Sequence, residues 1–372
     1  MSALTASTAR CVRVSSRLSD FADVWPSMAA PLPDTHVFQT REFLEVWLRT
    51  IGAARRVKPC FVSIQDVSGA QILVALGIEI RRGAKVLTFL DGGVSDYNAP
   101  VVIGAPDFGG GLWRDIIAAV PPVDTVVLEK MPLSIGGKPN PLCAGLHSAA
   151  PPSGFALPLS GDLQSYTATR LHRPKDSRRK RRRLGEAGEV RFLIAETQND
   201  VRRLYGAFIA QKTRRYIEKN GVDGFDRPGY RRYFEKMTER LHPAHVHLSA
   251  LEVNGELLAT HWGLIYDKRF YCLMLAYADS PLAQYSPARL LVEDLIAWCY
   301  GQGLEAFDFG VGDTPWKTLL GADAAPLAHT AMPLTPFGWA YDSAAKLKRR
   351  VLVRQTPPPA SPILEQPHDS HG

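Results

Sequence analysis

The feature that most constrains the fold of this chain is a pattern that recurs 186 residues along the sequence. In each half, two hydrophobic runs are joined by a turn, at 67–69 and 253–255, and are followed by a third run. Five residues of the first half recur at this spacing as Ser249, Val253, Gly255, Gly263 and Leu273. Matches this few also arise by chance, but their coincidence with two hairpins favours a duplicated unit. We therefore expect an α/β fold of two similar units, each a mostly antiparallel twisted sheet flanked by helices.

The length of 372 residues also favours two domains, because a single hydrophobic core rarely grows so large. The segment from Pro132 to Pro158 is rich in proline, glycine and serine, which is typical of a linker. We expect an N-terminal domain over residues 1–160 and a C-terminal domain over 161–340. The remaining residues, 341–372, are expected to form a basic helix and then a disordered, proline-rich tail from Thr356.

The composition argues against several classes of protein. Hydrophobic residues make up 45% of the chain and charged residues 22%, which is typical of soluble globular proteins. No run approaches the ~18 apolar residues of a membrane helix, so we expect no signal peptide, no membrane span and a cytoplasmic location. The five cysteines are scattered without a C-x-x-C pair, which argues against a disulfide framework and against a metal site.

The positive charge of the chain is concentrated in one run. The formal net charge is +7, and residues 173–183 alone hold eight Lys or Arg against one Asp. A run of this kind is typical of a solvated, charged helix face. Without interleaved aromatic residues it gives only non-specific attraction to nucleic acid, so we expect no specific nucleic-acid partner.

The start of one predicted helix is unusual. Ser286 stands at the N-cap position and Pro287 at the first helical position, and apolar residues then recur at helical spacing. The first turn contains no acid and places Arg289 at the positive end of the helix dipole. This arrangement is poor for an isolated helix but suits a helix that receives an anion such as a phosphate.

Two motifs in this region resemble a known family. The sequence YSPARLL at 285–291 and GLEAFDFGVGDTPWK at 303–317 are similar to the C-terminal part of CelD-type acetyltransferase-like proteins of the GNAT superfamily. The segment FLEVWLRTI at 43–51 and the loop SDYNAP at 95–100 resemble earlier elements of the same proteins. The FemABX peptidyltransferases, which share the doubled fold, also share the FDFG and W/Y-K ending.

The resemblance implies a site for acetyl-CoA or another acyl-CoA as co-substrate, with no metal. The donor would lie between two splayed strands, at 269–277 and 306–310. Its pantetheine would contact the first strand near Leu275 and Ala276, and its pyrophosphate would meet the helix start formed by Tyr285, Ser286, Pro287, Ala288 and Arg289. Lys317 matches the family lysine that handles the acyl or leaving group, and is expected to stabilise an oxyanion or thiolate.

The remaining candidate residues each have a structural alternative. Asp308 is a catalytic candidate beside Lys317, and an ion pair between the two side chains at a strand end is an equal alternative. His261 suits a general base near neutral pH, but a single histidine in a strand is more often structural. Tyr277 is a candidate proton donor to the leaving thiolate. We place Asp313 on the substrate side, and give the loop Asp96, Tyr97 and Asn98 equal weight as a substrate loop and as a turn.

These observations support three hypotheses. The first is an acyl-CoA-dependent N- or O-acyltransferase that modifies a small-molecule amine or sugar hydroxyl, such as a precursor of an exopolysaccharide. The second is a FemABX-like transferase that takes its acyl group from aminoacyl-tRNA, to which the basic run would contribute. The third is a non-catalytic partner protein in a polysaccharide-synthesis assembly. The acceptor, the acyl chain and the oligomeric state stay open.

Overall fold

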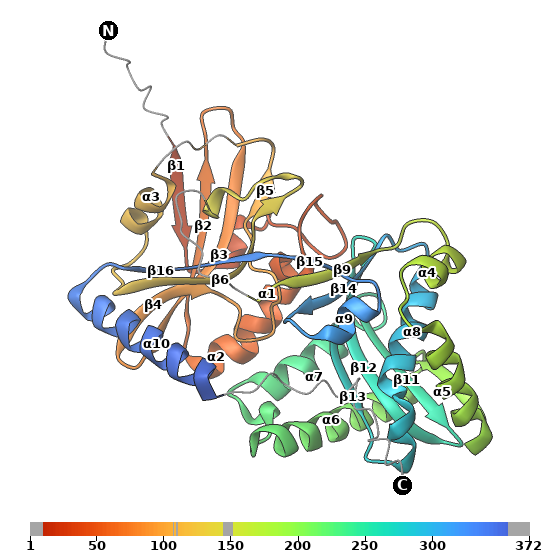
Figure 1. The fold of residues 1–372 in the computed structure, drawn as a ribbon. Coiled ribbons are helices and arrows are strands. Elements are labelled where there is room, and N and C mark those ends of the chain that lie inside the picture. Colours follow the sequence, from red (N-terminus) through yellow and green to blue (C-terminus); the bar gives the residue numbers. More distant parts are fainter. Residues whose placement is uncertain (1–9, 107, 109–110, 144–151, 356–372) are drawn as a thin grey trace. The chain divides into compact units, whose positions relative to one another are not determined.

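The computed structural model describes residues 10–106, 108, 111–143 and 152–355, which form two compact units. The first unit comprises the described residues up to Pro152 together with those from Pro326 onward, and the second runs from Ser153 to Ala325. Each unit is built on a mixed β-sheet flanked by helices (Figure 1). The α/β fold class expected from the sequence is therefore confirmed.

The sheet of the first unit has the order β1-β2-β3-β4-β6-β16, and β5 pairs with β3. Neighbouring strands are antiparallel, except that β4 and β6 run parallel. The strands are β1 Cys11–Ser15, β2 Lys58–Gln65, β3 Gln71–Arg81, β4 Ala84–Phe89, β5 Val101–Ile103, β6 Thr125–Pro132 and β16 Leu327–Pro333, with a hairpin of β7 Ser134–Ile135 and β8 Lys138–Pro139. The α and π helices are α1 Arg41–Trp47, η3 Leu48–Gly52, α2 Ala53–Arg55, α3 Leu112–Ala119 and α10 Pro336–Gln355, and short 3-10 turns are η1 Leu18–Phe21, η2 Val37–Gln39 and η4 Pro141–Cys143.

The sheet of the second unit has the order β10-β11-β12-β13-β14-β9-β15. Here too the strands are antiparallel except for one pair, β13 and β14. The strands are β9 Gly154–Pro158, β10 Val190–Ile194, β11 Val246–Val253, β12 Glu256–Tyr266, β13 Arg269–Tyr277, β14 Ala306–Val311 and β15 Asp323–Ala325. The helices are α4 Leu163–Thr169, α5 Pro174–Ala187, α6 Gln198–Asn220, α7 Tyr230–Leu241, α8 Pro287–Gly301 and α9 Pro315–Leu319, with 3-10 turns η5 Gly224–Asp226 and η6 Pro281–Tyr285.

The two sheets repeat one topology. Strands β1-β2-β3-β4-β6 of the first correspond in order and direction to β10-β11-β12-β13-β14 of the second. In each unit a helix, α3 or α8, connects the two parallel strands. The hairpins whose turns lie 186 residues apart are β2–β3 and β11–β12, so the pattern in the sequence falls on equivalent elements.

The units do not divide at the residues expected from the sequence. Strand β9 lies inside the proline-rich segment that we expected to be a linker, and it pairs with β14 of the second sheet. Strand β16, expected in the second domain, pairs with β6 of the first sheet. The basic helix expected after residue 340 is present within α10, and the tail from Thr356 lies outside the described residues. The sequence did not reveal these pairings because both strands join a sheet distant from them in sequence.

The second unit has one packed layer on each face of its sheet. Helix α8 buries Leu291, Leu295 and Cys299 completely, at the helical spacing seen in the sequence. On the other face, the Phe234 ring of α7 packs edge-on against Trp262 of β12, with centroids 4.9 Å apart. Because His261 precedes Trp262 in the strand, its side chain lies on the α8 face. Among the helices that the structure describes, none is long and apolar enough to cross a membrane.

Candidate functional site

Strands β13 and β14 run parallel for a short distance and then separate (Figure 1). They pair only at Arg269 with Ala306, Phe270 with Phe307 and Tyr271 with Asp308 in the described structure. Residues 272–277 of β13 and 309–311 of β14 continue as strands without pairing with each other. We call these two segments the strand divergence. They coincide with the splayed strands that the family resemblance implied.

The main-chain carbonyls of Leu275 and Tyr277 face the divergence. The N–H group of Ala278 donates to Leu258 on the β12 side, and main-chain groups alternate in direction along a strand. The carbonyls of Leu275 and Tyr277 therefore point to the opposite edge. Each is capped by a cation of α6: Lys212 Nζ donates to Leu275 at 3.2 Å and Arg214 Nη2 donates to Tyr277 at 2.7 Å.

Of the two predicted strand contacts, only Leu275 therefore offers main-chain groups to a ligand in the divergence. Ala276 is in register with Thr260 of β12, and its main chain is turned toward that strand. The expectation that Ala276 presents its main chain to a cofactor is not supported. Neither Lys212 nor Arg214 was a candidate from the sequence, because nothing in α6 indicates which strand carbonyls its side chains reach.

The β14 side of the divergence contains the two polar residues of the final motif. Asp308 is almost fully buried, and its carboxylate accepts hydrogen bonds from the Gly310 N–H at 2.8 Å and from Arg269 Nη1 at 3.1 Å. Lys317, which α9 places nearby, is also buried and donates from Nζ to the Gly310 carbonyl at 3.1 Å. Its ammonium lies 5.1 Å from the centre of the Phe155 ring. The Asp308 ion pair found here is with Arg269, which sequence reasoning did not consider.

Cys272 shows that the two sides of the divergence face a common region. Burial raises the pKa of its thiol to about 12, while Lys317 and Lys212 act in the opposite direction through their charges. The thiol is thus an inert core group at neutral pH. Cys272 nevertheless shows that a lysine of α6 and a lysine of α9 lie near the same point, because both affect its thiol through their charges. Asp313, beyond β14, is exposed and accepts a hydrogen bond from the Ser153 N–H at 3.2 Å.

The start of α8 differs from the sequence expectation in how its side chains are used. Ser286 has a left-handed backbone conformation with φ of 54° and makes no side-chain cap. Its hydroxyl instead accepts a hydrogen bond from Lys180 Nζ of α5 at 3.0 Å. The N–H groups of Arg289 and Leu290 already donate to the Ser286 carbonyl at 3.0 and 3.2 Å. Pro287 and Ala288 are buried at this helix start, and Tyr285 is half-buried.

Arg289 does not present its charge at the helix start as we expected. Its guanidinium is buried, donates to Glu293 at 2.8 Å and to the His172 carbonyl at 2.7 Å. The physical reason is the spacing of four residues between Arg289 and Glu293, which places them on one helix face. This signal was present in the sequence. The cation that does reach the helix start, Lys180, comes from the basic run, and its approach depends on tertiary packing.

His261 and Tyr277 are the two remaining catalytic candidates, and their surroundings differ. His261 is fully buried, stacks on Phe270 with centroids 5.3 Å apart, and burial lowers its pKa well below the ordinary value. The imidazole is therefore neutral, but its contact with an acceptor would require core side chains to move. Tyr277 is half-buried at the end of β13, where the Arg215 guanidinium lies 4.6 Å from its ring centre.

In the first unit, the equivalent edge of β6 is occupied by the protein itself. Strands β4 and β6 pair at Val86 with Thr125 and at Leu87 with Val126. Farther along β6, the Asn98 N–H donates to the Lys130 carbonyl at 2.9 Å, and Asn98 Nδ2 donates to the Glu129 carbonyl at 2.9 Å. The β6 edge is thus hydrogen-bonded to the loop that follows β4.

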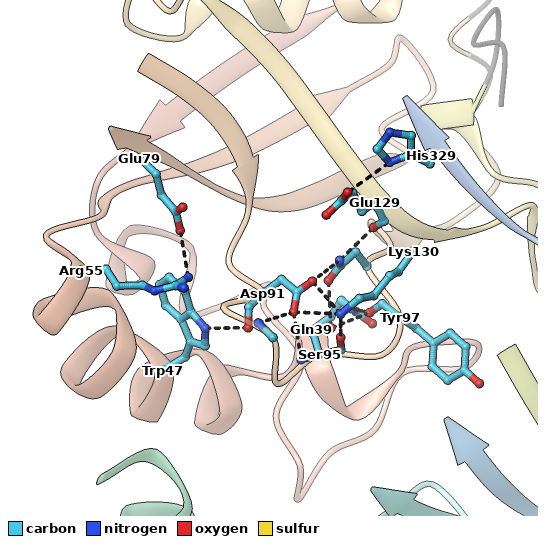
Figure 2. Close-up of polar contacts among 12 residues, drawn as sticks. Gln39, Trp47, Arg55, Glu79, Asp91, Ser95, Tyr97, Glu129, Lys130 and His329 are labelled. Atoms are coloured by element: carbon cyan, nitrogen blue, oxygen red, sulfur yellow. Dashed lines mark hydrogen bonds and ion pairs between the residues drawn. The ribbon is translucent and has the colours of Figure 1, made fainter. Parts of the chain in front are cut away.

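A partly buried polar cluster holds this loop in place (Figure 2). Lys130 Nζ contacts the Asp91 carboxylate at 2.9 Å and donates to the Ser95 carbonyl at 2.6 Å. Gln39 Nε2 donates to the Tyr97 carbonyl at 2.6 Å. Of the three candidate substrate residues, Tyr97 and Asn98 are buried and Asp96 is half-buried. The alternative reading of this loop as a structural turn is thus the one that its contacts favour.

Comparison with known proteins identifies the second unit. Residues 172–318, which contain the strand divergence, match the family model described as "Acetyltransferase (GNAT) domain". No curated protein matches the chain. The family match covers less than half of the chain; it indicates an acyltransferase domain of GNAT type and gives neither the donor nor the acceptor.

Solved structures extend the similarity to most of the chain. FemX is 10% identical, with a TM-score of 0.56 over 87% of this chain and 97% of FemX, which shows a common fold. L-PGS from Bacillus licheniformis is 11% identical, with a TM-score of 0.48 over 84% of this chain and 97% of that one. A tandem GNAT protein from the clavulanic acid biosynthesis pathway is 13% identical, with a TM-score of 0.46 over 88% of this chain and 99% of that one.

The arrangement supplies electrostatic stabilisation and hydrogen bonding for group transfer. Two lysines border the divergence, two carbonyls of β13 face it, and a third cation stands at the start of α8. Within the described residues, no three His, Cys, Asp or Glu side chains come close enough together to hold a metal ion. The side chains that border the divergence are thus suited to stabilising negative charge and to transferring protons.

Proposed function

We propose that this protein transfers an acyl group from acetyl-CoA or another acyl-CoA to a nitrogen or oxygen of a small acceptor. The thioester would lie in the strand divergence of the second unit. Amide groups of the donor would meet the β13 edge at Leu275 and Tyr277, whose carbonyls face this side. The phosphates would lie near Lys180 and Ser286, where an ammonium adds to the positive end of the α8 dipole.

The observation that carries this proposal is the contrast between the two units. In the first, main-chain and side-chain groups of Asn98 complete the edge of the strand that diverges. In the second, the facing carbonyls are bound by the ends of long cationic side chains: Gly310 of β14 accepts from Lys317, and Leu275 and Tyr277 of β13 accept from Lys212 and Arg214. A ligand displaces such a side chain at little cost, whereas displacing Asn98 would break two buried hydrogen bonds. The second unit is therefore the one that we assign to the donor.

The residues near the divergence have distinct proposed roles. Lys317 would stabilise the negative charge that develops on the carbonyl oxygen or on the departing sulfur. Asp308 would hold Gly310 and Arg269 in place around it. Tyr277 remains a candidate donor of a proton to the thiolate, and Asp313, exposed beyond β14, a candidate contact for the acceptor.

The acceptor that we propose is an amine or a sugar hydroxyl. Its basis is the resemblance of the YSPARLL and FDFGVGDTPWK motifs to CelD-type proteins, which suggests a precursor of a polysaccharide. The geometry of the divergence is equally suited to either nucleophile. A panel of amino sugars, sugars and polyamines, each tested with acetyl-CoA by release of free thiol, separates the two classes.

The donor is tested first, by native mass spectrometry of the purified full-length protein followed by calorimetric titration with acetyl-CoA. We expect a retained CoA species or a saturable binding curve with one site per chain. Lys317→Ala should then lower turnover far more than it weakens donor binding. Absence of binding by acetyl-CoA, by longer acyl-CoA and by CoA itself would contradict the proposal.

The basic helix α5 favours a second candidate, a FemABX-like transfer from aminoacyl-tRNA. Five of its cations pair with acids at Asp176, Glu186 and Asp294. Among the described residues, Arg173, Lys175 and Arg178 are exposed and form no ion pair. Three free cations give weak, salt-sensitive attraction to RNA. Binding of tRNA that survives physiological salt, in a protein that ignores CoA, would favour this second candidate.

A further inference from the structure

Helix α6 holds one lysine at a fixed place beside the strand divergence. The helix begins with a capping box between Thr197 and Asp200 and buries Gln211 against β12. Gln211 donates to the Leu257 carbonyl at 2.7 Å and accepts from the Thr260 hydroxyl at 2.7 Å. These two bonds fix the helix at the residue immediately before Lys212. The Lys212 ammonium is thereby positioned at the carbonyl of Leu275, on the edge that faces the divergence.

The surroundings of Lys212 are poor for an ammonium ion. Its side chain is half-buried, and its polar partner is the Leu275 carbonyl at 3.2 Å, with the Tyr216 ring centre 5.3 Å away. Among the described residues, no carboxylate forms an ion pair with it, whereas Arg214 and its neighbour Arg215 both pair with Glu218. A lysine kept from water without a counter-charge loses its proton more readily than a lysine on the surface.

We propose that Lys212 is the general base of the acyl transfer, an assignment that rests on the proposed function of the site. The uncharged Nζ takes a proton from the acceptor, converting an ammonium into an amine or assisting a hydroxyl to attack. The new bond forms between the acceptor atom and the thioester carbon, and the carbon–sulfur bond breaks. For an amine acceptor, its remaining surplus proton goes to the departing sulfur, and Lys212 returns its own proton to water. For a hydroxyl acceptor, the proton that Lys212 has taken up goes to the departing sulfur. Lys317, on the other side, is left to stabilise the oxyanion.

The ionisable groups around Lys212 support this role. The ionisable groups near Lys212 are Arg215 and Lys219 on the same helix and Cys272 on β13. Burial first, and then the charges of Arg215 and Lys219, lower the pKa of Lys212 to about 8. Lys212 is then neutral in about a tenth of the protein molecules at pH 7 and in most of them at pH 9. A base of this strength is close to the optimum for proton transfer near neutral pH.

The assignment is tested on the full-length protein by competitive labelling of its lysines with acetic anhydride across pH 6–11. Peptide mass spectrometry measures the labelling of each lysine with and without CoA at a saturating concentration. We expect Lys212 to react with a midpoint near pH 8 and to be protected by CoA at least tenfold. Lys236, which pairs with Glu239 on α7, is the matched control and should show neither property.

Each result of this experiment decides one question. If Lys212 titrates together with Lys236, it is an ordinary lysine and cannot be the base. If CoA binds by calorimetry without protecting Lys212, the side chain does not face the acyl group, and the assignment fails while the proposed function stands. If CoA does not bind at all, the proposed function fails, and the general-base role fails with it.

A kinetic arm separates catalysis from positioning. With an acceptor found by thiol release from acetyl-CoA, Lys212→Met should lower kcat by about 100-fold and remove the limb of kcat/KM that rises near pH 8. Calorimetric affinity for CoA should change by less than threefold. Lys236→Met should keep both the rate and the pH profile. A Lys212→Met protein that retains the rising limb would overturn the assignment.

Discussion

Two buried histidines make the stability of the second unit sensitive to acid. His247 and His261 lie on the α8 face with ring centroids 5.9 Å apart and are 5% and 0% exposed. Within the described structure, both ring nitrogens of His247 and Nε2 of His261 lack a hydrogen-bond partner. Burial lowers the pKa of His247 to about 3, and burial with the nearby His247 lowers that of His261 well below its usual value.

The sign and the size of the effect follow from these pKa directions. Both histidines stay neutral in the folded protein at pH 5, whereas in the unfolded chain they take up protons below about pH 6.5. Their contribution to stability is therefore complete above pH 6.5 and is lost as the pH falls. At about 1.4 kcal/mol per histidine per pH unit, the loss at pH 5 is about 2 kcal/mol for each, or about 4 kcal/mol for the pair.

The measurement is urea unfolding, followed by circular dichroism, at pH 8, 6.5 and 5. We compare the wild type with His247→Leu/His261→Leu, and use His172→Gln, at an exposed position, as the control. Between pH 8 and pH 5, the free energy of unfolding of the double variant should rise by about 4 kcal/mol relative to that of the wild type, while that of the control should not. Carboxylates titrate alike in all three proteins and cancel. If the difference in free energy of unfolding between the double variant and the wild type is the same at all three pH values, the reasoning is refuted. Both histidines would then take up protons in the folded protein as readily as in the unfolded chain.

Three further predictions follow from the contacts around the two strand divergences. Lys180→Gln should weaken CoA binding about tenfold in calorimetry with an unchanged thermal melt, because it removes one charge-assisted contact. Arg289→Gln should instead lower the melting temperature, since Glu293 loses its ion-pair partner, and equal effects of both would contradict the assignment. Asp308→Ala should cost about 2–3 kcal/mol in urea unfolding, and an unchanged midpoint would show that its hydrogen bonds are not needed for the fold. Asn98→Ala should cost about 2 kcal/mol and leave CoA affinity unchanged, and a loss of affinity would return the donor site to the first unit.

The sequence predicted those features that depend on neighbours along the chain. The hairpin of β11 and β12 was visible as two alternating runs around Asn254 and Gly255, and α8 as a proline-started helix with apolar residues at helical spacing. The repeat located both hairpins. The motif that contains Asp308 and Lys317 pointed to residues that do border the divergence.

The features that the sequence did not reveal are those set by tertiary packing. Strands β9 and β16 are short and have no local signal for the sheet that each joins. Lys212 and Lys180 reach their positions because α6 and α5 pack beside particular strands and turns, which spacing within either helix does not encode. Arg289 is different, because Glu293 one turn later was a readable sign that its charge is used within the helix.

The two units show two solutions to the same physical problem. Parallel strands that separate expose main-chain groups, which are costly to bury without partners and prone to unwanted pairing. The first unit completes its edge with Asn98 and fixes that loop through the partly buried ion pair of Asp91 and Lys130. The second unit covers its edge with the side chains of Lys212, Arg214 and Lys317. A ligand that hydrogen-bonds to the same carbonyls can displace the ends of these side chains.

This difference connects the fold to the proposed chemistry. When a donor amide takes over the Leu275 carbonyl, the Lys212 ammonium loses its hydrogen-bond partner while it stays near Arg215. Losing that partner further disfavours the charged form, so donor binding would lower the pKa of Lys212 and increase the neutral fraction. The base would thus become more available once the thioester is in place. The same side chain that protects the strand edge of the empty protein would then take the proton from the acceptor.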